Sequence, residues 1–163
     1  MVRRNTLSSV PRSAMLQLDN QLCFALYSAS LTMTKLYKPV LDRLGLTYPQ
    51  YLTMLVLWEA NELSVSELGQ RLYLDSGTLT PLLKRLEAAG WLKRERDAAD
   101  ERRVIVSLTP EGRKLRDKAA GVPELVASAA QCSLSDLSDL KKRLQRLRSN
   151  LSAHLDSSAD EAA

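Results

Sequence analysis

Residues 75–108 read DSGTLTPLLKRLEAAGWLKRERDAADERRVIVSL, and the period of the apolar residues changes in the middle of this stretch. Before Gly90 the leucines recur at the helical intervals i, i+3, i+4 and i+7. These leucines are Leu79, Leu82, Leu83 and Leu86. After Gly90 the pattern becomes extended and β-branched, which is typical of strands. The stretch therefore predicts a helix that ends at Gly90, followed by a β-hairpin with strands at 91–96 and 103–108.

The start of this helix is harder to place, because two signals conflict. Asp75 is a favourable N-cap residue, but Pro81 would then be the sixth residue of the helix. Only the first four N–H groups of a helix lack intrahelical partners, so proline is poorly tolerated at the sixth position. Pro81 therefore favours a start near Gly77 or an irregular first turn.

Two capping boxes precede this helix. Residues 47–50 (TYPQ) open a helix that runs through about Ala60, and residues 64–67 (SVSE) open a short one. The order of helix, short helix, helix and hairpin over residues 47–108 is typical of a helix-turn-helix followed by a β wing. A helix of this kind fits the major groove of B-DNA, and a thin hairpin reaches the minor groove or the backbone. The sequence therefore predicts a module that binds duplex DNA.

The polar residues of this module are the candidates for DNA contact. Hydroxyls near a helix N-terminus can contact phosphates or base edges, and basic side chains can contact the backbone. The predicted DNA-binding residues are Ser76, Thr78, Thr80, Lys84, Arg85, Arg94, Asp100 and Arg102. Residues 61–110 hold eight basic and eight acidic residues, so position and not net charge carries this prediction. At the loop tip, Asp100 can accept from the Arg102 guanidinium and direct it toward the minor groove.

Amphipathic helices flank the module on both sides. Residues 16–44 have helical periodicity and end at Gly45, and Thr109-Pro110 opens a helix that runs toward residues 121–123. The last helix opens at Ser133 or Ser135 and carries the stripe Leu134, Leu137, Leu140, Leu144, Leu147 and Leu151. We expect these faces to interlock in a homodimer, because the middle module is too small to cover them. A final helix that packs on its own core is the alternative.

The expected fold is therefore mainly α with a small β-hairpin, a winged helix-turn-helix between dimerising helices. The expected parts are a flexible tail (1–15), a dimerisation helix (16–46), the DNA-binding module (47–108), C-terminal dimerisation helices (109–155) and a second flexible tail (156–163).

The composition excludes several classes of function. The 163 residues are 45% apolar and 26% charged, and they include one His and two Cys. A catalytic triad or a zinc site would depend on that single His, so we expect no enzyme activity, metal or cofactor. Residues 1–8 are basic and lack the apolar run of a signal peptide, and no later run is long enough to span a bilayer. We therefore expect a cytoplasmic protein that does not bind membranes.

Several strings resemble the organic hydroperoxide resistance regulators, a subfamily of the MarR winged-helix regulators, and the similarity spans about residues 16–155. These strings are residues 22–27 (LCFALY), 38–39 (KP), 47–51 (TYPQY), 73–81 (YLDSGTLTP), 100–103 (DERR) and 108–112 (LTPEG). The resemblance implies a homodimeric repressor that leaves its double-stranded operator DNA when an organic hydroperoxide oxidises a cysteine.

The resemblance assigns the sensing role to Cys23. This residue lies near the start of the first helix, where free N–H groups favour a thiolate, although a cysteine in an apolar helix is more commonly inert. The family pattern places hydroxyl donors at Tyr37 and Tyr48. Tyr37 lies 14 residues further along the same helix, about 21 Å away, so these donors would come from the other subunit. Tyr27, one turn beyond Cys23, can contribute locally, and simple packing is the alternative for all three tyrosines.

The second cysteine completes the expected switch. In the two-cysteine members that this sequence resembles, a sulfenic acid condenses with a resolving thiol, so the resemblance implies a Cys23–Cys132 disulfide between subunits. An intrachain bond stays possible at this point. Three other functions are also open: a repressor released by a small apolar or phenolic ligand, a thiol peroxidase, and a non-specific architectural DNA binder.

Overall fold

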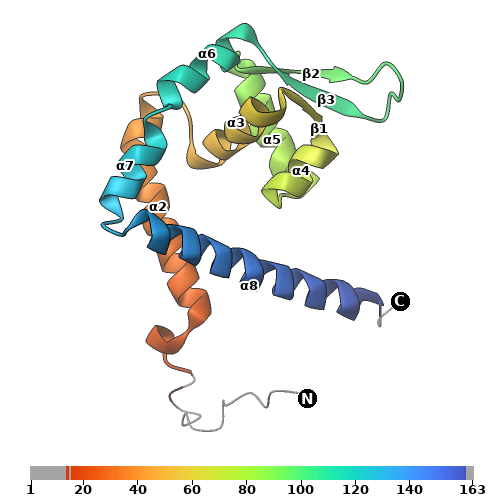
Figure 1. Ribbon diagram of the computed structural model, residues 1–163. Helices are drawn as coiled ribbons and strands as arrows, with labels where there is room; N and C mark the ends of the chain where they lie inside the picture. Colours follow the sequence, from red (N-terminus) through yellow and green to blue (C-terminus); the bar gives the residue numbers. More distant parts are fainter. Residues whose placement is uncertain (1–13, 15, 161–163) are drawn as a thin grey trace. The chain divides into compact units, whose positions relative to one another are not determined.

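The computed structural model describes residue 14 and residues 16–160. The expected tail at residues 1–15 lies almost entirely outside the described residues, as do residues 161–163. The chain divides into two compact units, Met1–Ala120 and Gly121–Ala163 (Figure 1). No helix within the described residues is both long enough and apolar enough to cross a membrane.

The first unit is a winged helix-turn-helix preceded by a long helix, as the sequence predicts. Its elements are η1 (Leu18–Asn20), α2 (Leu22–Asp42), α3 (Tyr48–Ala60), β1 (Glu62–Ser64), α4 (Val65–Leu72), α5 (Ser76–Ala88), β2 (Leu92–Arg96), β3 (Val104–Leu108) and α6 (Pro110–Ala119). The helices α4 and α5 form the helix-turn-helix, and β2 and β3 extend beside them as the wing (Figure 1).

The wing strands belong to a three-stranded antiparallel sheet of the described chain, with the order β1-β3-β2. The predicted two-stranded hairpin is correct for β2 and β3 but misses β1. In β1 only three residues pair, with Leu63 opposite Val106. A segment this short has no alternation that a sequence pattern can detect.

The helix starts follow their caps. Both predicted capping boxes are present, at Thr47 and at Ser64. The helix α5 starts at Ser76, next to Gly77, where the start was expected; Asp75 is the N-cap, and its carboxylate accepts the Thr78 N–H at 2.9 Å. Pro81 lies inside α5, so the strong cap outweighs the one hydrogen bond that a proline cannot donate.

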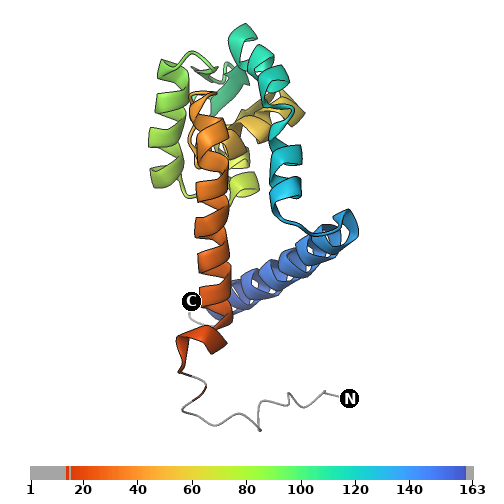
Figure 2. The ribbon, with the colours of Figure 1, turned by 90° about the vertical axis from the view of Figure 1, so that its left-hand side faces the viewer.

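The first helical region is shorter than predicted. Residues 16–44 do not form a single helix, because Gln21 adopts an extended conformation (φ −89°, ψ 118°) between η1 and α2. From Leu22 onward α2 is continuous to Asp42 and includes Pro39 (Figure 2). Gly45 follows with φ +69°, which agrees with the predicted glycine C-cap.

The core of the first unit gathers leucines from its helices and valine from its sheet. Of the four leucines in α5, Leu79, Leu83 and Leu86 are buried, whereas Leu82 is half-buried. The core of this unit also includes the buried side chains of Met54, Leu57, Leu68 and Val106. One face of α5 is thus fixed in the core, and its other face is left for solvent or a partner.

The base of the wing is held by side chains that donate to backbone carbonyls and by one close backbone approach. The buried Trp58 indole Nε1–H donates to the Gly112 carbonyl at 2.8 Å, and the Thr109 hydroxyl donates to the Gly90 carbonyl at 2.7 Å. Gly112 also approaches the backbone of Trp91 so closely that a Cβ there would lie 1.9 Å from the Trp91 carbonyl oxygen. Only glycine fits at this position without displacement of backbone.

The second unit consists of α7 (Val122–Ala129) and α8 (Leu134–Asp160). The sequence reading missed α7, in which Pro123 lies in the first turn and starts a new helix. Ser133 caps α8 by accepting the Asp136 N–H at 3.1 Å, as predicted. The helix α8 continues to Asp160, so residues 156–160 of the expected tail at 156–163 are helical.

We expect Gly112→Ala to destabilise the protein by about 3 kcal/mol, because the new Cβ would overlap the Trp91 carbonyl and force backbone movement. Thermal or denaturant unfolding followed by circular dichroism measures this loss. Gly121→Ala is the matched control, because nothing lies within 4 Å of the Cβ that it adds. Equal stability of the two variants would contradict the packing at Gly112.

Candidate nucleic-acid interface and thiol site

The outer face of α5 carries the predicted polar residues. Ser76, Thr78, Lys84 and Arg85 are exposed, and Thr80 is half-buried. The Thr78 hydroxyl donates to the Asp75 carboxylate at 2.9 Å. Hydrogen bonds from the Thr78 backbone N–H and then from its hydroxyl hold the pKa of Asp75 below its ordinary value. Asp75 is therefore a stable anionic cap at neutral pH, and the Thr78 hydroxyl is already oriented by that cap.

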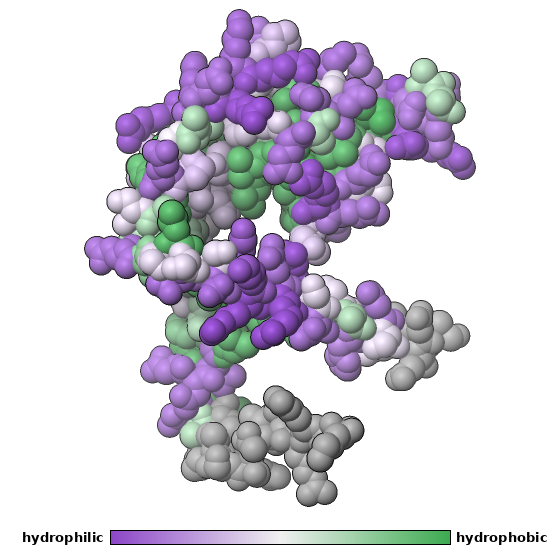
Figure 3. Space-filling view, viewed as in Figure 1, coloured by the Kyte–Doolittle hydropathy of each residue, from purple (hydrophilic) through white to green (hydrophobic). Residues whose placement is uncertain are grey.

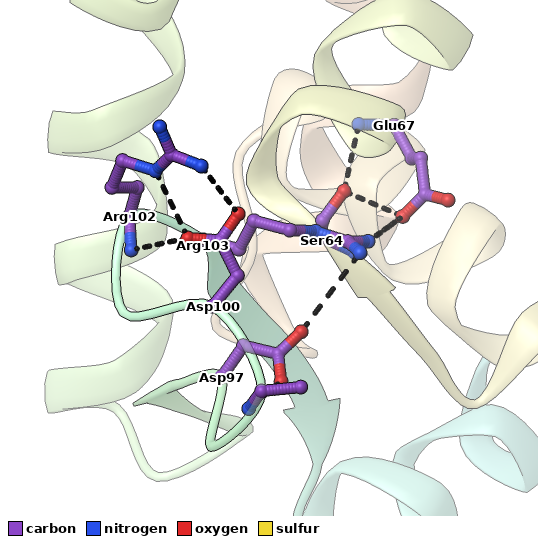
Figure 4. Close-up of polar contacts among 7 residues, drawn as sticks. Ser64, Glu67, Asp97, Asp100, Arg102 and Arg103 are labelled. Atoms are coloured by element: carbon purple, nitrogen blue, oxygen red, sulfur yellow. Dashed lines mark hydrogen bonds and ion pairs between the residues drawn. The ribbon is translucent and has the colours of Figure 1, made fainter.

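The wing tip presents Arg102, whose side chain is 91% exposed. Its Nε–H donates to the Asp100 carboxylate at 3.1 Å, and the Arg102 backbone N–H donates to the same oxygen at 3.1 Å (Figure 4). These hydrogen bonds, the side-chain one first, lower the pKa of Asp100. The predicted Asp100–Arg102 pair is thus present, and it directs a guanidinium into solvent at the end of a narrow hairpin.

Arg94 has a different environment from the other predicted contacts. Its Nε–H and Nη2–H donate to Glu87 Oε2 at 3.0 and 2.6 Å, and its backbone N–H donates to Glu87 Oε1 at 2.9 Å. The Arg94 side chain is 23% exposed. The structure therefore shows Arg94 tying β2 to the end of α5, and its predicted contact with DNA stays a prediction.

Arg103 was missed by the sequence reading. Its guanidinium lies 3.8 Å from the Glu67 carboxylate and 3.9 Å from the Asp97 carboxylate, so it links the wing to α4 (Figure 4). Glu67 also accepts hydrogen bonds from Ser64, which are the main cause of its lowered pKa. The sequence identifies Glu67 as part of a capping box, but no local pattern places a wing arginine beside it.

A groove of about 960 Å³ lies between the helix-turn-helix and the wing. Among the predicted residues, Ser76, Thr80, Arg94 and Arg102 line it, whereas Thr78, Lys84 and Arg85 lie outside it. Hydrophobic surface lies between polar side chains on this face of the first unit (Figure 3). Hydroxyls of the helix-turn-helix and arginines of the wing line this groove beside apolar side chains, and both kinds of polar group can contact phosphates.

Cys23 lies at the second position of α2, near the helix start as expected, and it is exposed. The side chain of the N-cap residue Gln21 does not accept a hydrogen bond from the N–H groups in the first turn of α2. Tyr27, one turn further, is 62% exposed. A thiol at this place is accessible to a dissolved oxidant and lies beside an exposed phenol.

The structure brings Tyr37 and Tyr48 together, with ring centroids 4.8 Å apart. Tyr51 joins them at 5.8 Å from Tyr37, and the sequence reading missed it. Burial, then the neighbouring phenols, raises the pKa of Tyr37 to about 12, so its hydroxyl stays a hydrogen-bond donor at neutral pH. Because α2 is continuous, Tyr37 lies about 21 Å along the helix from Cys23 of its own chain. The tyrosines and this thiol are therefore not one site within a chain.

Cys132 lies in the second unit, in the turn between α7 and α8, and is exposed. Gln131 before it has a positive φ of 51°. The Cys132 thiol contacts the Ala130 carbonyl at 3.1 Å. Both cysteines are free thiols in this structure.

We expect Glu87→Gln to weaken the pH dependence of stability on the acid side. The hydrogen bonds from Arg94 lower the pKa of Glu87, so this contact stabilises the fold above the ordinary value of 4.5 and is lost as pH falls below it. At neutral pH the loss should be at most about 1 kcal/mol, because the pair is partly exposed. Urea unfolding between neutral pH and about pH 3 measures the slope. Glu101→Gln is the control, and a similar slope for both variants would contradict the expectation.

Known proteins share this architecture. The family model of the transcriptional regulators SarA/Rot matches residues 35–119. The organic hydroperoxide resistance transcriptional regulator of Bacillus subtilis (strain 168) is 50% identical over 136 residues, which cover 83% of this chain and 92% of that protein.

Two solved structures of AbfR, a protein of Staphylococcus epidermidis, are also similar. Reduced AbfR bound to DNA is 36% identical with a TM-score of 0.76, and the match covers 89% of this chain and 99% of that chain. Disulfide-formed AbfR is 39% identical with a TM-score of 0.59, and the match covers 83% and 96%. The chain therefore belongs to the MarR-like winged-helix transcriptional regulators and, within them, to the organic hydroperoxide resistance regulators.

Proposed function

We propose that this protein is a homodimeric repressor in the cytoplasm, which binds double-stranded operator DNA and leaves it when an organic hydroperoxide oxidises Cys23. The observation that carries the proposal is the groove between α5 and the wing, with hydroxyls on one wall and Arg102 on the other. The reduced form of AbfR, a relative with the same fold, was solved bound to DNA. On this proposal α5 enters the major groove, and Arg102 reaches the adjacent minor groove.

The exposed apolar faces of the terminal helices support a homodimer. In α2, Leu22 is 60% exposed and Leu31 is 45% exposed, and in α8, Leu140 is 53% exposed and Leu151 is 56% exposed. No side chain between residues 134 and 158 is fully buried. A helix with this stripe requires a partner to cover its leucines. A second copy that covers them would hold two recognition helices about 34–36 Å apart, as successive major grooves require.

The oxidation chemistry needs two steps. The Cys23 thiolate attacks the peroxide oxygen, the O–O bond breaks, and the products are a sulfenic acid and, after protonation, an alcohol. The Cys132 thiolate then attacks the sulfenyl sulfur, which forms the disulfide and expels hydroxide, and a proton from solvent converts the hydroxide to water. We propose that Cys132 comes from the partner subunit, and that the partner's tyrosine donors stabilise the reduced thiolate. AbfR was solved in a disulfide form, which supports this route in a relative.

The disulfide would act on DNA binding through geometry. A disulfide requires Cα atoms about 4.4–6.8 Å apart, so its formation pulls two helical segments of the dimer together. The spacing of the recognition helices then changes, and both half-sites lose their fit at once. A coupling of a few kcal/mol is enough to change operator occupancy by orders of magnitude.

Cys23→Ser should keep the protein on DNA in the presence of an organic hydroperoxide, because no sulfenic acid can form. Gel shifts with a duplex selected by the wild-type protein from a random-sequence pool, with and without cumene hydroperoxide, measure the release. Non-reducing electrophoresis should show a covalent dimer for the wild type and none for Cys132→Ser. Release of Cys23→Ser by peroxide would overturn the thiol sensor, and undiminished release by an apolar phenol would favour the ligand-controlled alternative.

Arg102→Ala should weaken binding to the selected duplex by about tenfold or more, because the variant loses an exposed cation at the wing tip of each subunit. The dependence of affinity on salt concentration should also become less steep. Fluorescence anisotropy over a salt series measures both effects. Lys118→Ala on α6 is the control with the same charge change, and equal losses for both variants would contradict a specific role of the wing tip.

A further inference from the structure

The helix α4 ends in an unusual way. The C-cap residue that follows it, Tyr73, has φ 56° and ψ 39°, which is the left-handed region of the backbone. A bulky residue is disfavoured there, because its Cβ approaches neighbouring carbonyl oxygen. Such a residue persists only where something other than local backbone preference retains it.

The hydrogen bonds around Tyr73 form a Schellman motif. The Leu74 N–H donates to the Gly69 carbonyl at 3.0 Å, and the Tyr73 N–H donates to the Gln70 carbonyl at 3.4 Å. Such motifs normally hold glycine at the left-handed position.

Two other helices in the described part of the chain end in the same motif and do hold glycine. At the end of α2 the left-handed residue is Gly45, and at the end of α5 it is Gly90, with φ of 69° and 79°. The paired bonds are Leu46 N–H to the Leu41 carbonyl with Gly45 N–H to Asp42, and Trp91 N–H to the Leu86 carbonyl with Gly90 N–H to Glu87. The same turn thus carries a tyrosine only between the two helices of the helix-turn-helix.

The tyrosine is not a core residue, because its side chain is 64% exposed. Tyr73 instead lines the groove between the helix-turn-helix and the wing, together with Ser76 and Arg102. It stands two residues before Asp75, the N-cap of α5.

We propose that Tyr73 contacts the sugar–phosphate backbone of duplex DNA, with its hydroxyl donating a hydrogen bond to a phosphate oxygen. The proposal rests on the DNA binding proposed above. In helix-turn-helix proteins the first helix crosses the backbone while the second enters the major groove, so the turn between them lies near phosphates. Tyrosine hydroxyls are regular donors to such phosphates. The strained backbone then lowers the stability of the free protein, and it holds the tyrosine where this contact would form.

The variants Tyr73→Gly and Tyr73→Phe test this contact. Tyr73→Gly relieves the backbone strain, so the midpoint of thermal unfolding should rise, while affinity for the selected duplex should fall by about tenfold. Tyr73→Phe should leave the midpoint near that of the wild type and weaken binding to a similar extent. Asn61→Gly is the control, because Asn61 also has a positive φ, of 64°, but lies outside the groove. It should leave affinity unchanged.

The outcomes separate the contact from a structural role and from the proposed function. A Tyr73→Gly protein that binds as tightly as the wild type would overturn the contact alone. A Tyr73→Gly protein that loses stability and affinity together would show a structural role and overturn it too. Wild-type affinity in Tyr73→Phe would overturn the hydroxyl contact. A wild-type protein that binds no duplex would overturn the proposed function and, with it, this contact.

Discussion

The close approach of Gly112 to the backbone at Trp91 is the constraint on which the DNA-binding module depends. The Trp91 carbonyl occupies the space where a Cβ of residue 112 would stand, and the Trp58 indole donates to the carbonyl of the same glycine. The Thr109 hydroxyl donates to the Gly90 carbonyl, where α5 ends. Three elements, α3, α5 and α6, therefore meet at the base of the wing. The packing of these backbone segments therefore helps to fix the direction of the wing relative to α5.

The arginines of the wing differ in their carboxylate partners and in how far their side chains are exposed. Glu87 holds Arg94 at the base, where the guanidinium is 23% exposed, and Arg103 lies half-exposed between two acidic residues. Arg102 is 91% exposed and pairs only through Asp100, which orients it. Residues 61–110 hold eight basic and eight acidic residues, so this division is what creates a local positive charge. Contact with DNA then depends on the fit of the module to its operator more than on general attraction to a polyanion.

The sequence predicted those parts of the fold whose signals are local. Caps at Thr47, Ser64 and Ser133 and the glycine after α5 marked helix ends correctly, because a cap depends on residues three or four positions apart. It failed where the deciding contact is distant. The three residues of β1 form a strand only because β3 lies beside them, and one partner of Arg103, Glu67, lies on the helix α4, far from it in the sequence. The Asp100–Arg102 pair was predictable because its residues are two positions apart. The Glu67–Arg103 pair was not, because its residues are far apart in the sequence.

The tyrosines proposed to stabilise the partner's thiolate pack in a row that reaches Trp58 of α3, and Trp58 contacts the base of the wing. Tyr37 contacts Tyr48 and Tyr51, and Tyr51 packs edge-on against Trp58, with ring centroids 6.3 Å apart. The Trp58 indole in turn donates to the Gly112 carbonyl at the base of the wing. A protein interior is closely packed, so displacement of one ring in this row requires its neighbours to move. An oxidised thiol that withdraws from the partner's tyrosines therefore need not approach DNA, because the row of rings already extends from the proposed sensor to the wing.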